Sequence, residues 1–415
     1  MAPPTLQLTS LLHSPLVDRA GERLGRLEDV IVRLDGNFPP VTGLMGRIGG
    51  RELFVPNDRI AALEANKVQL SGEKLSLKRF ERREGEVLLG EDVLGRKLIH
   101  VEAARLVPAN DIVLARIDGW WRVVGIDPSP RARLRRLLHR TAEEATSPII
   151  EWTQLEPFVG HVPTSRLRLP ARKLAQLHPA QIADLVEAAS HEQGEEIIEA
   201  VRQQPELEAD VFEELDEHHQ LEFIRERPDD QVAQVLARMA TDDAADLIAE
   251  LEQERREPVL ARLPAAKARQ IKALLGYNAS TAGGLMSPEL VAVPETASAR
   301  EALEQVKKSE IAPEALTTIY TTGQDGTLTG AIPVVALLRA PPEEPVAQVA
   351  TTDLVHVHTD ADITEVARLM TDYNLTMLPV LDGDDKPVGV VTVDDVLELT
   401  LPTDWRRRFG VLAEQ

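Results

Sequence analysis

The stretch "LPVLDGDDKPVGVVTVDDVLEL", residues 378–399, decides the fold of the C-terminal part of the chain. It starts with a short apolar run, breaks at a turn rich in Asp and Gly, and continues as a second apolar run typical of a strand. The acidic pair Asp394 and Asp395 follows Thr392, and such a polar start favours a helix. The order strand, turn, strand, helix predicts a compact α/β module.

The same order occurs earlier in the chain. In "TIYTTGQDGTLTGAIPVVALL", residues 318–338, the turn "GQDGT" matches "DGDDK", and Gly330 matches Gly389. A helical segment with a polar start precedes the strands in both copies. We therefore predict a pair of α/β domains over residues 277–345 and 346–402, followed by a tail over residues 403–415.

Between residues 174 and 276 the apolar period changes to 3.6, which predicts helices. Four segments in this region begin with Pro or a small polar residue and continue as an apolar stripe: "LHPAQIADLVEA", "RPDDQVAQVLARM", "TDDAADLIAELEQ" and "LPAAKARQIKALL". Short helices that cannot bury their stripes alone must stack on one another. We expect an all-α superhelical domain.

The N-terminal third is typical of two small β-rich units. "DRAGERLGRLEDVIV" and "DVLGRKLIHVEAARLV" each place an Asp three residues before Gly21 or Gly95 and then continue at strand spacing. We predict small β-rich units over residues 1–80 and 81–130. A linker over residues 131–173 would begin with the basic stretch "RARLRRLLHR". The predicted fold class is multidomain α+β.

The composition limits the possible chemistry. The 415 residues include no cysteine, so disulfides and thiolate metal sites are excluded. The net charge of −22 is uneven, because residues 1–172 carry 26 Lys and Arg against 22 Asp and Glu, whereas the remainder carries 20 against 46. An acidic C-terminal part makes nucleic acid an unlikely partner and suits divalent cations. Acidity that only maintains solubility is the alternative.

No apolar run is long enough to span a bilayer, and the N-terminus does not have the pattern of a signal peptide. The sequence therefore predicts a soluble, cytoplasmic chain. No catalytic motif is recognisable, so we expect no enzyme activity.

The string "STAGGLM", residues 280–286, follows helical units of the form "PxxxADLxEx". This combination resembles the junction between the cytoplasmic N domain and the first CBS domain of MgtE-type magnesium channels. The string "LPVLDGDDKPVGVVTVDDVL" is similar to the CBS consensus. The N-terminal strands resemble the PRC-barrel family, whose members mostly serve as docking modules, and this resemblance implies that the two β-rich units are small β-barrels. The resemblance to MgtE-type channels implies a Mg²⁺-sensing regulatory protein that forms a homodimer through its CBS domains.

Family channels continue from the CBS pair into membrane helices, whereas this sequence stops soon after "VLELTLP". The expectation is a regulator that acts on a separate membrane metal transporter, in the cytoplasm or at the inner face of the membrane. The alternative is that the sequence is a truncated transporter.

In the family, carboxylates between the N domain and the CBS pair bind Mg²⁺. The matching positions are Asp242 and Asp246 in the helical domain, and Asp394, Asp395 and Glu398 in "VTVDDVLEL". Mg²⁺ prefers oxygen ligands, and facing acidic surfaces would separate without the ion and close with it. The competing explanation is that Thr241 caps its helix and that acids in a first turn favour the helix dipole; this explanation does not cover Asp246.

CBS pairs also bind adenine nucleotides such as ATP or AMP, through a Ser or Thr and an Asp three residues later. Thr392 and Asp395 match that pattern, whereas the first domain has Pro333 and Ala336, whose side chains cannot make these hydrogen bonds. Asp395 is thus a candidate for both ligands. The alternative function is an adenine-nucleotide-sensing CBS adaptor or scaffold protein without a metal role, and a third is an RNA-associated scaffold.

Overall fold

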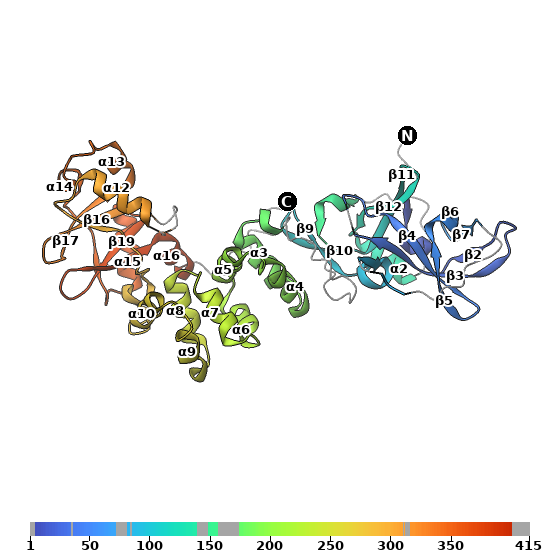
Figure 1. Cartoon of the computed structure of the whole chain (residues 1–415), viewed down its shortest axis with the longest axis horizontal. Helices are drawn as coiled ribbons and strands as arrows, with labels where there is room; N and C mark the ends of the chain where they lie inside the picture. Colours follow the sequence, from blue (N-terminus) through green and yellow to red (C-terminus); the bar gives the residue numbers. More distant parts are fainter. Residues whose placement is uncertain are drawn as a thin grey trace. The chain divides into compact units, whose positions relative to one another are not determined.

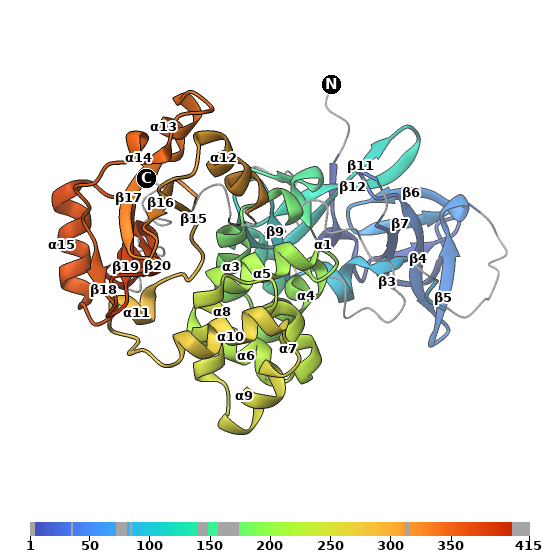
Figure 2. The same cartoon turned by 60° about the vertical axis from the view of Figure 1, so that its left-hand side comes forward.

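The computed structural model describes residues 5–34, 36–71, 81–83, 85–138, 148–156, 174–309, 311 and 316–400. The predicted tail over residues 403–415 and much of the predicted linker lie outside these ranges. The chain divides into two compact units, Met1–Asp216 and Glu217–Gln415. Figures 1 and 2 show their elements from two directions.

The first unit contains three sheets. The largest has the strand order β5-β4-β3-β2-β7-β6, with β8 paired to β3. Its strands are β2 (Pro15–Val17), β3 (Arg23–Arg33), β4 (Val41–Ile48), β5 (Arg51–Pro56), β6 (Ile60–Glu64), β7 (Lys67–Leu70) and β8 (Glu86–Leu88). Within the described ranges β5 and β6 end this order without pairing to each other. The mixed α+β class is confirmed, but the strands that the structure describes do not form the predicted barrels.

The two smaller sheets have the orders β1-β11-β12-β13 and β10-β9-β14. Their strands are β1 (Thr5–Gln7), β9 (Lys97–His100), β10 (Arg105–Pro108), β11 (Asp111–Ile117), β12 (Trp120–Asp127), β13 (Ile150–Glu151) and β14 (Leu155–Glu156). The short helices are α1 (Leu8–Leu11) and α2 (Pro130–Leu138). Strands of both predicted β-rich units share one apolar core, in which Val30 and Leu44 lie with Ile112 and Val123.

The β-rich part contains an internal repeat. The N–H of His13 donates to Leu27 O and the N–H of Leu27 donates to Ser14 O, both at 2.8 Å. The N–H of Gly95 donates to Ala109 O at 2.7 Å and the N–H of Ala109 donates to Arg96 O at 2.8 Å. The sequence pattern matched Gly95 with Gly21, but these hydrogen bonds match Gly95 with His13. The backbone has a positive φ at both residues, 66° at His13 and 82° at Gly95, and glycine adopts this conformation most easily.

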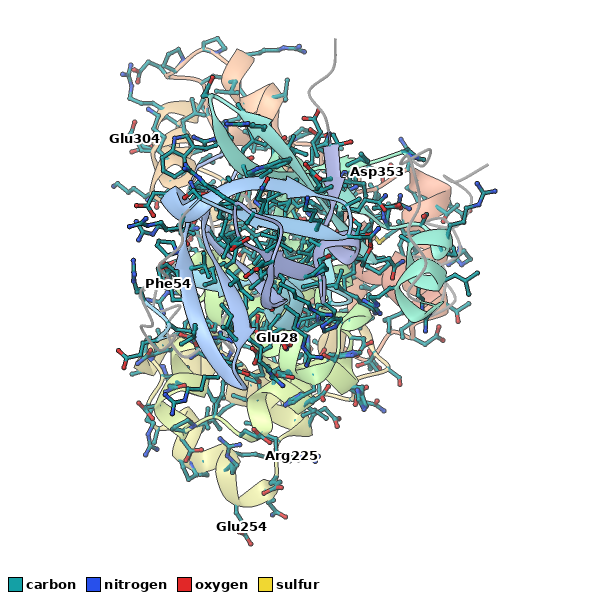
Figure 3. The ribbon with its side chains drawn as sticks, turned by 90° about the vertical axis from the view of Figure 1, so that its right-hand side faces the viewer. Glu28, Phe54, Arg225, Glu254, Glu304 and Asp353 are labelled. Carbon is teal, nitrogen blue, oxygen red and sulfur yellow. The ribbon has the colours of Figure 1, made fainter. Side chains whose placement is uncertain are left out.

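Charged side chains form pairs on the strands of the largest sheet. Glu28 on β3 accepts from Arg26 Nε at 2.7 Å and pairs with Arg47 Nε at 3.1 Å. Figure 3 labels Glu28, and also Phe54 on β5, over whose ring Arg83 lies at 4.8 Å. These exposed pairs contribute little to stability.

Helices follow the β-rich part. The first unit ends with α3 (Pro179–Ala188), α4 (His191–Val201) and α5 (Pro205–Glu214), and proline begins α3 and α5 as expected from its fixed φ. The second unit begins with α6 (Glu217–Arg225), α7 (Asp229–Leu236), α8 (Thr241–Glu250), α9 (Gln253–Leu260) and α10 (Ala265–Leu274). Their apolar stripes are buried, as Val232 on α7 and Leu247 on α8 illustrate.

Two α/β modules complete the second unit. The first contains β15 (Ala292–Pro294), α12 (Ala299–Lys308), β16 (Thr318–Thr322), β17 (Leu328–Pro333) and α13 (Val334–Arg339). The second contains α14 (Val346–Val349), β18 (Val357–His358), α15 (Ile363–Tyr373), β19 (Met377–Leu381), β20 (Pro387–Thr392) and α16 (Val393–Thr400). In each sheet the first strand pairs in parallel and the second pair is antiparallel, so the repeat found in the sequence is a repeat of topology.

The short helix α11 (Ala282–Leu285) precedes the modules and lies beside the second one. The N–H of Ala282 donates to Ala361 O at 2.8 Å, and the N–H of Gly283 donates to Thr359 O at 2.9 Å. A Cβ on Gly283 would lie 2.8 Å from the Tyr277 ring and 2.9 Å from Thr359 O, which explains the glycine. Within the described ranges, no helix combines the length and the apolar character needed to cross a membrane.

Candidate metal centre

Helix α8 begins at Thr241 itself. Ala240 occupies the N-cap position and makes no side-chain hydrogen bond there. The hydroxyl of Thr241, a residue without solvent exposure, instead donates to Glu289 Oε1 at 2.8 Å. The expectation that Thr241 caps α8 is therefore wrong, because its hydroxyl makes a tertiary contact.

Asp242 is the most enclosed carboxylate of this region. Its Oδ1 atom is buried and has no hydrogen-bond partner among the described residues. Burial, followed by the charge of Asp395 and then that of Glu289, raises the pKa of Asp242 to about 7. Hydrogen bonds from backbone N–H groups at the helix start lower this pKa but do not compensate. Asp242 is therefore charged only at considerable cost near neutral pH.

Asp246 lies on the same face of α8, four residues later. Burial, followed by the charges of Glu250, Asp395 and Glu217 in that order, raises its pKa to about 6. The side chain is more exposed than that of Asp242. Asp395 acts on both aspartates, so the structure brings three of the predicted carboxylates into one electrostatic cluster.

Helix α16 supplies the CBS side of this cluster. Asp395 Oδ2 accepts a hydrogen bond from Thr392 Oγ1 at 2.6 Å and another from the Thr392 N–H at 3.1 Å. These bonds orient the carboxylate at the start of the helix. Asp394 is exposed on α16, and the side chain of Glu398 lies outside the described residues. The cluster thus contains Asp395 from α16, while Asp394 and Glu398 remain predictions.

Glu289 is the residue that the sequence reasoning missed. It lies between α11 and β15, in a segment without regular structure, and its charge acts on Asp242. No periodicity or repeated motif marks it, because its position depends on the tertiary contact with Thr241. We define the acidic cluster as Asp242, Asp246, Glu289 and Asp395.

The nearby cations of the helical layer are used elsewhere. Arg255 Nη2 donates to Arg227 O at 2.6 Å, Arg256 Nε donates to Leu251 O at 2.9 Å, and Lys267 Nζ donates to Met239 O. These side chains satisfy carbonyls at helix ends. The charges that act most strongly on Asp242 and Asp246 are all negative.

An all-carboxylate cluster of this kind fits a hard divalent cation. Mg²⁺ takes oxygen ligands, keeps several waters, and needs only one or two carboxylates from each side. Two carboxylates about 6 Å apart repel by about 3 kcal/mol at an effective dielectric constant of about 20. A bound cation would therefore convert the repulsion between the carboxylates of α8 and α16 into an attraction through the ion.

The Thr392–Asp395 pair also matches the predicted nucleotide site. Thr392 ends β20 and Asp395 lies in the first turn of α16, which is the junction of strand and helix. Pro333 ends β17 at the equivalent junction of the first module and caps α13 without a side-chain hydrogen bond. Only the second module therefore offers this pair of polar groups.

Comparison with known families finds two matches. The model of the MgtE intracellular N domain matches residues 177–280, and the CBS domain model matches residues 346–401. Neither family model describes an enzyme.

Curated relatives are magnesium transporters named MgtE. The protein of Thermus thermophilus is 42% identical over 130 residues, which is 31% of this chain and 29% of the relative. The protein of Bacillus subtilis is 27% identical over 192 residues, which is 46% of this chain and 43% of the relative. The matched region thus spans less than half the length of these relatives.

Solved structures extend the likeness to both domains together. The cytosolic domain of the Mg²⁺ channel MgtE in complex with ATP is 31% identical with a TM-score of 0.52, over 56% of this chain and 93% of that chain. The soluble part of a magnesium transporter is 26% identical with a TM-score of 0.51, over 55% of this chain and 90% of that one. The chain therefore carries an MgtE intracellular N domain followed by a CBS domain, and over this region it belongs to the family of MgtE cytosolic domains.

Proposed function

We propose that the chain is a Mg²⁺-sensing regulatory protein in which a divalent cation holds helix α8 against helix α16. The observation that carries this proposal is the buried Asp242 Oδ1, which has no partner in the described residues and faces the charges of Asp395 and Glu289. A buried anion surrounded by anions is unfavourable unless a cation or a proton neutralises it. Similarity to the cytosolic domain of a Mg²⁺ channel supports Mg²⁺ as that cation.

The regulatory mechanism follows from differential stability. Without the ion, repulsion among the acidic cluster favours an arrangement in which the N domain and the CBS pair separate. With the ion, the closed arrangement is favoured by its coordination to both sides. Asp242 and Asp246 would supply the α8 side of the site, and Asp395, with Asp394 and Glu398 as the further predicted ligands, the α16 side.

A titration with a matched control tests this proposal. Asp242→Asn removes one charge from the acidic cluster, whereas Asp230→Asn removes a charge at an early position of α7 that is exposed. We expect Mg²⁺ to raise the melting temperature and protease resistance of wild type and of Asp230→Asn, but to have a much smaller effect on Asp242→Asn. A wild-type protein that does not respond to millimolar Mg²⁺ would exclude the metal function.

The proposed partner is a separate membrane metal transporter, on which the closed and separated arrangements act differently. This choice rests on the curated relatives, which are magnesium transporters. It places the chain in the cytoplasm or at the inner face of the membrane. Co-purification with a co-expressed MgtE-type membrane domain, compared with and without Mg²⁺, tests it; equal recovery of an unrelated membrane protein would contradict it.

A second candidate function is adenine-nucleotide sensing without a metal role. The Thr392–Asp395 pair supports it, as does the similarity to a cytosolic domain that was solved in complex with ATP. The ribose hydroxyls of ATP or AMP would form hydrogen bonds with both the Thr392 hydroxyl and the Asp395 carboxylate. If AMP raised the melting temperature and Mg²⁺ did not, this second function would be favoured over the first.

We also propose a homodimer through the CBS pair. Helix α13 exposes 56% of Val335 and 65% of Leu338, and helix α16 exposes Leu397 and Leu399. Val335 and Leu338 are three residues apart and so share one face of α13, and exposed apolar side chains on one face are typical of a surface that a partner covers. A second copy of the same chain would bury equivalent surfaces against each other.

A further inference from the structure

Glu289 occupies a position between the helical layer and the CBS pair. The segment before it is attached to β20, because the N–H of Ser287 donates to Val390 O and the N–H of Val390 donates to Ser287 O, both at 2.9 Å. Strand β20 leads directly into α16, which carries Asp395. Glu289 is therefore held on the CBS side, although its carboxylate contacts Thr241 at the start of α8.

The hydrogen bond from Thr241 fixes the Glu289 carboxylate. Thr241 has no solvent exposure, and a hydroxyl has a single proton, which here is donated to Oε1. A carboxylate has two oxygens and about four acceptor sites, so this bond leaves most of its capacity unused. The fixed carboxylate acts electrostatically on Asp242, whose Oδ1 is buried without a partner in the described residues.

We propose that Glu289 is a further ligand of the cation, held in place by Thr241 as a positioning residue. The inference rests on the proposed Mg²⁺ function and adds a second contribution from the CBS side, independent of α16. Glu289 lies in the segment that joins the N domain to the CBS pair. As a ligand, it would couple ion binding directly to the orientation of the N domain relative to the CBS pair. Binding would then depend on two CBS-side contacts, which come from residues far apart in the sequence.

A purely structural role is the competing explanation, in which Glu289 only accepts the Thr241 hydrogen bond. The variant Glu289→Gln separates the two, because the amide oxygen still accepts that bond while the charge is lost. For a ligand, we expect Glu289→Gln to raise the melting temperature without Mg²⁺, since repulsion is reduced, and to raise the Mg²⁺ concentration at half-effect on the order of tenfold. If Glu289 is only an acceptor, the melting temperature without Mg²⁺ can still rise, because the lost charge acts on Asp242, but the Mg²⁺ concentration at half-effect stays unchanged.

Thr241 is tested by a pair of variants. Thr241→Val keeps the shape of the side chain but removes the donor, whereas Thr241→Ser restores a hydroxyl. If Thr241 positions the ligand, the half-effect concentration of Mg²⁺ rises on the order of tenfold in Thr241→Val and returns toward wild type in Thr241→Ser. Thr241→Val could instead lower stability, with Thr241→Ser restoring it, while the Mg²⁺ concentration at half-effect stays the same in both variants. Thr241 would then have only a structural role.

The outcomes distinguish this inference from the proposed function. If wild type responds to Mg²⁺ and Asp242→Asn does not, while Glu289→Gln responds like wild type, the function stands and Glu289 is not a ligand. If wild type itself does not respond, both fail. Glu295→Gln, a change of the same kind six residues later in the chain, should retain the wild-type response in either case.

Discussion

Asp395 on the last helix of the CBS pair is the residue whose charge acts most strongly on Asp242 on helix α8. The two residues are far apart in sequence and belong to different domains of the MgtE-type region. Burial and this charge together raise the pKa of Asp242 to about 7, and burial raises that of Asp246 to about 6. The electrostatic interaction between the carboxylates of α8 and α16 is thus sensitive to anything that neutralises them.

Protons should therefore replace the cation at low pH. A carboxyl group whose pKa rises from 3.8 to about 7 on folding binds more protons in the folded state over that window. Stability without metal consequently falls as the pH rises from about 4 to 7, and levels off above 7. With a chelator present, the melting temperature of wild type should therefore fall relative to that of Asp242→Asn as the pH rises from about 4 to 7.

The same titration predicts the pH dependence of Mg²⁺ binding. Protons and Mg²⁺ compete for the carboxylates, so the Mg²⁺ concentration at half-effect should rise as the pH falls from 8 to 6. Asp230→Asn should show the wild-type dependence, because Asp230 is exposed on α7. A half-effect concentration independent of pH would contradict neutralisation of Asp242 as the basis of the response.

Adenine nucleotide should bind through the second module only. Thr392→Val removes the hydroxyl beside Asp395 Oδ2, and we expect it to abolish any increase in melting temperature caused by AMP in the absence of Mg²⁺. Asp394→Asn, at an exposed neighbouring position, serves as the control and should retain the effect. An AMP effect that persists in Thr392→Val would place the nucleotide elsewhere.

Local patterns were sufficient to predict the helical layer and the two α/β modules. The 3.6 period from residue 174 and the repeated strand-turn-strand-helix order both reflect burial of one face of each element. The aspartates of α8 and α16 were selected because they match the carboxylate positions implied by the resemblance to MgtE-type channels. Sequence could not indicate that Asp395 acts on Asp242 and Asp246, since that depends on packing between elements.

Residues whose role depends only on tertiary contact were missed or misread. Glu289 lies in an irregular segment without periodicity, and Thr241 was expected to cap its own helix although it contacts Glu289. The repeat in the β-rich part was aligned on Gly21, although the backbone hydrogen bonds match Gly95 with His13. Glycine adopts a positive φ most easily, but His13 also adopts one. The positions of the glycines alone therefore did not show how the two repeats align.

The exposed apolar side chains of α13 predict a concentration-dependent dimer. Leu338→Glu introduces a charge at a position that is 65% exposed, and it should shift the protein from dimer to monomer in light scattering after size exclusion. Leu275→Glu, on an exposed apolar residue after α10, is the control and should remain dimeric. A wild-type monomer at high concentration, with or without Mg²⁺, would exclude the proposed homodimer.

The last prediction concerns the β-rich part, in which each repeat caps the helix of the other. Asp29 on β3 accepts from the N–H groups of Gly90 at 2.7 Å and Glu91 at 2.9 Å, at the start of a one-turn π-helix, Leu89–Val93. Asp111 on β11 accepts from the N–H of Thr9 in α1 at 3.1 Å and from its hydroxyl. Strands are exchanged in the same way, since β1 pairs with β11 and β8 pairs with β3.

Removing Asp29 should therefore destabilise both repeats and not only the first. Asp29→Ala removes the acceptor of three N–H groups, those of Val30, Gly90 and Glu91, at a cost of about 1 to 3 kcal/mol for each that stays buried without a partner. We expect a single cooperative unfolding transition of the β-rich part at a lower temperature, whereas Asp58→Ala, at an exposed position, should melt like wild type.

Hydrogen exchange of Asp29→Ala shows which strands are destabilised. Increased exchange should appear in β11 and β12 as well as in β3 and β4, because one apolar core joins them. Exchange confined to β3 and β4 would mean that the repeats unfold independently.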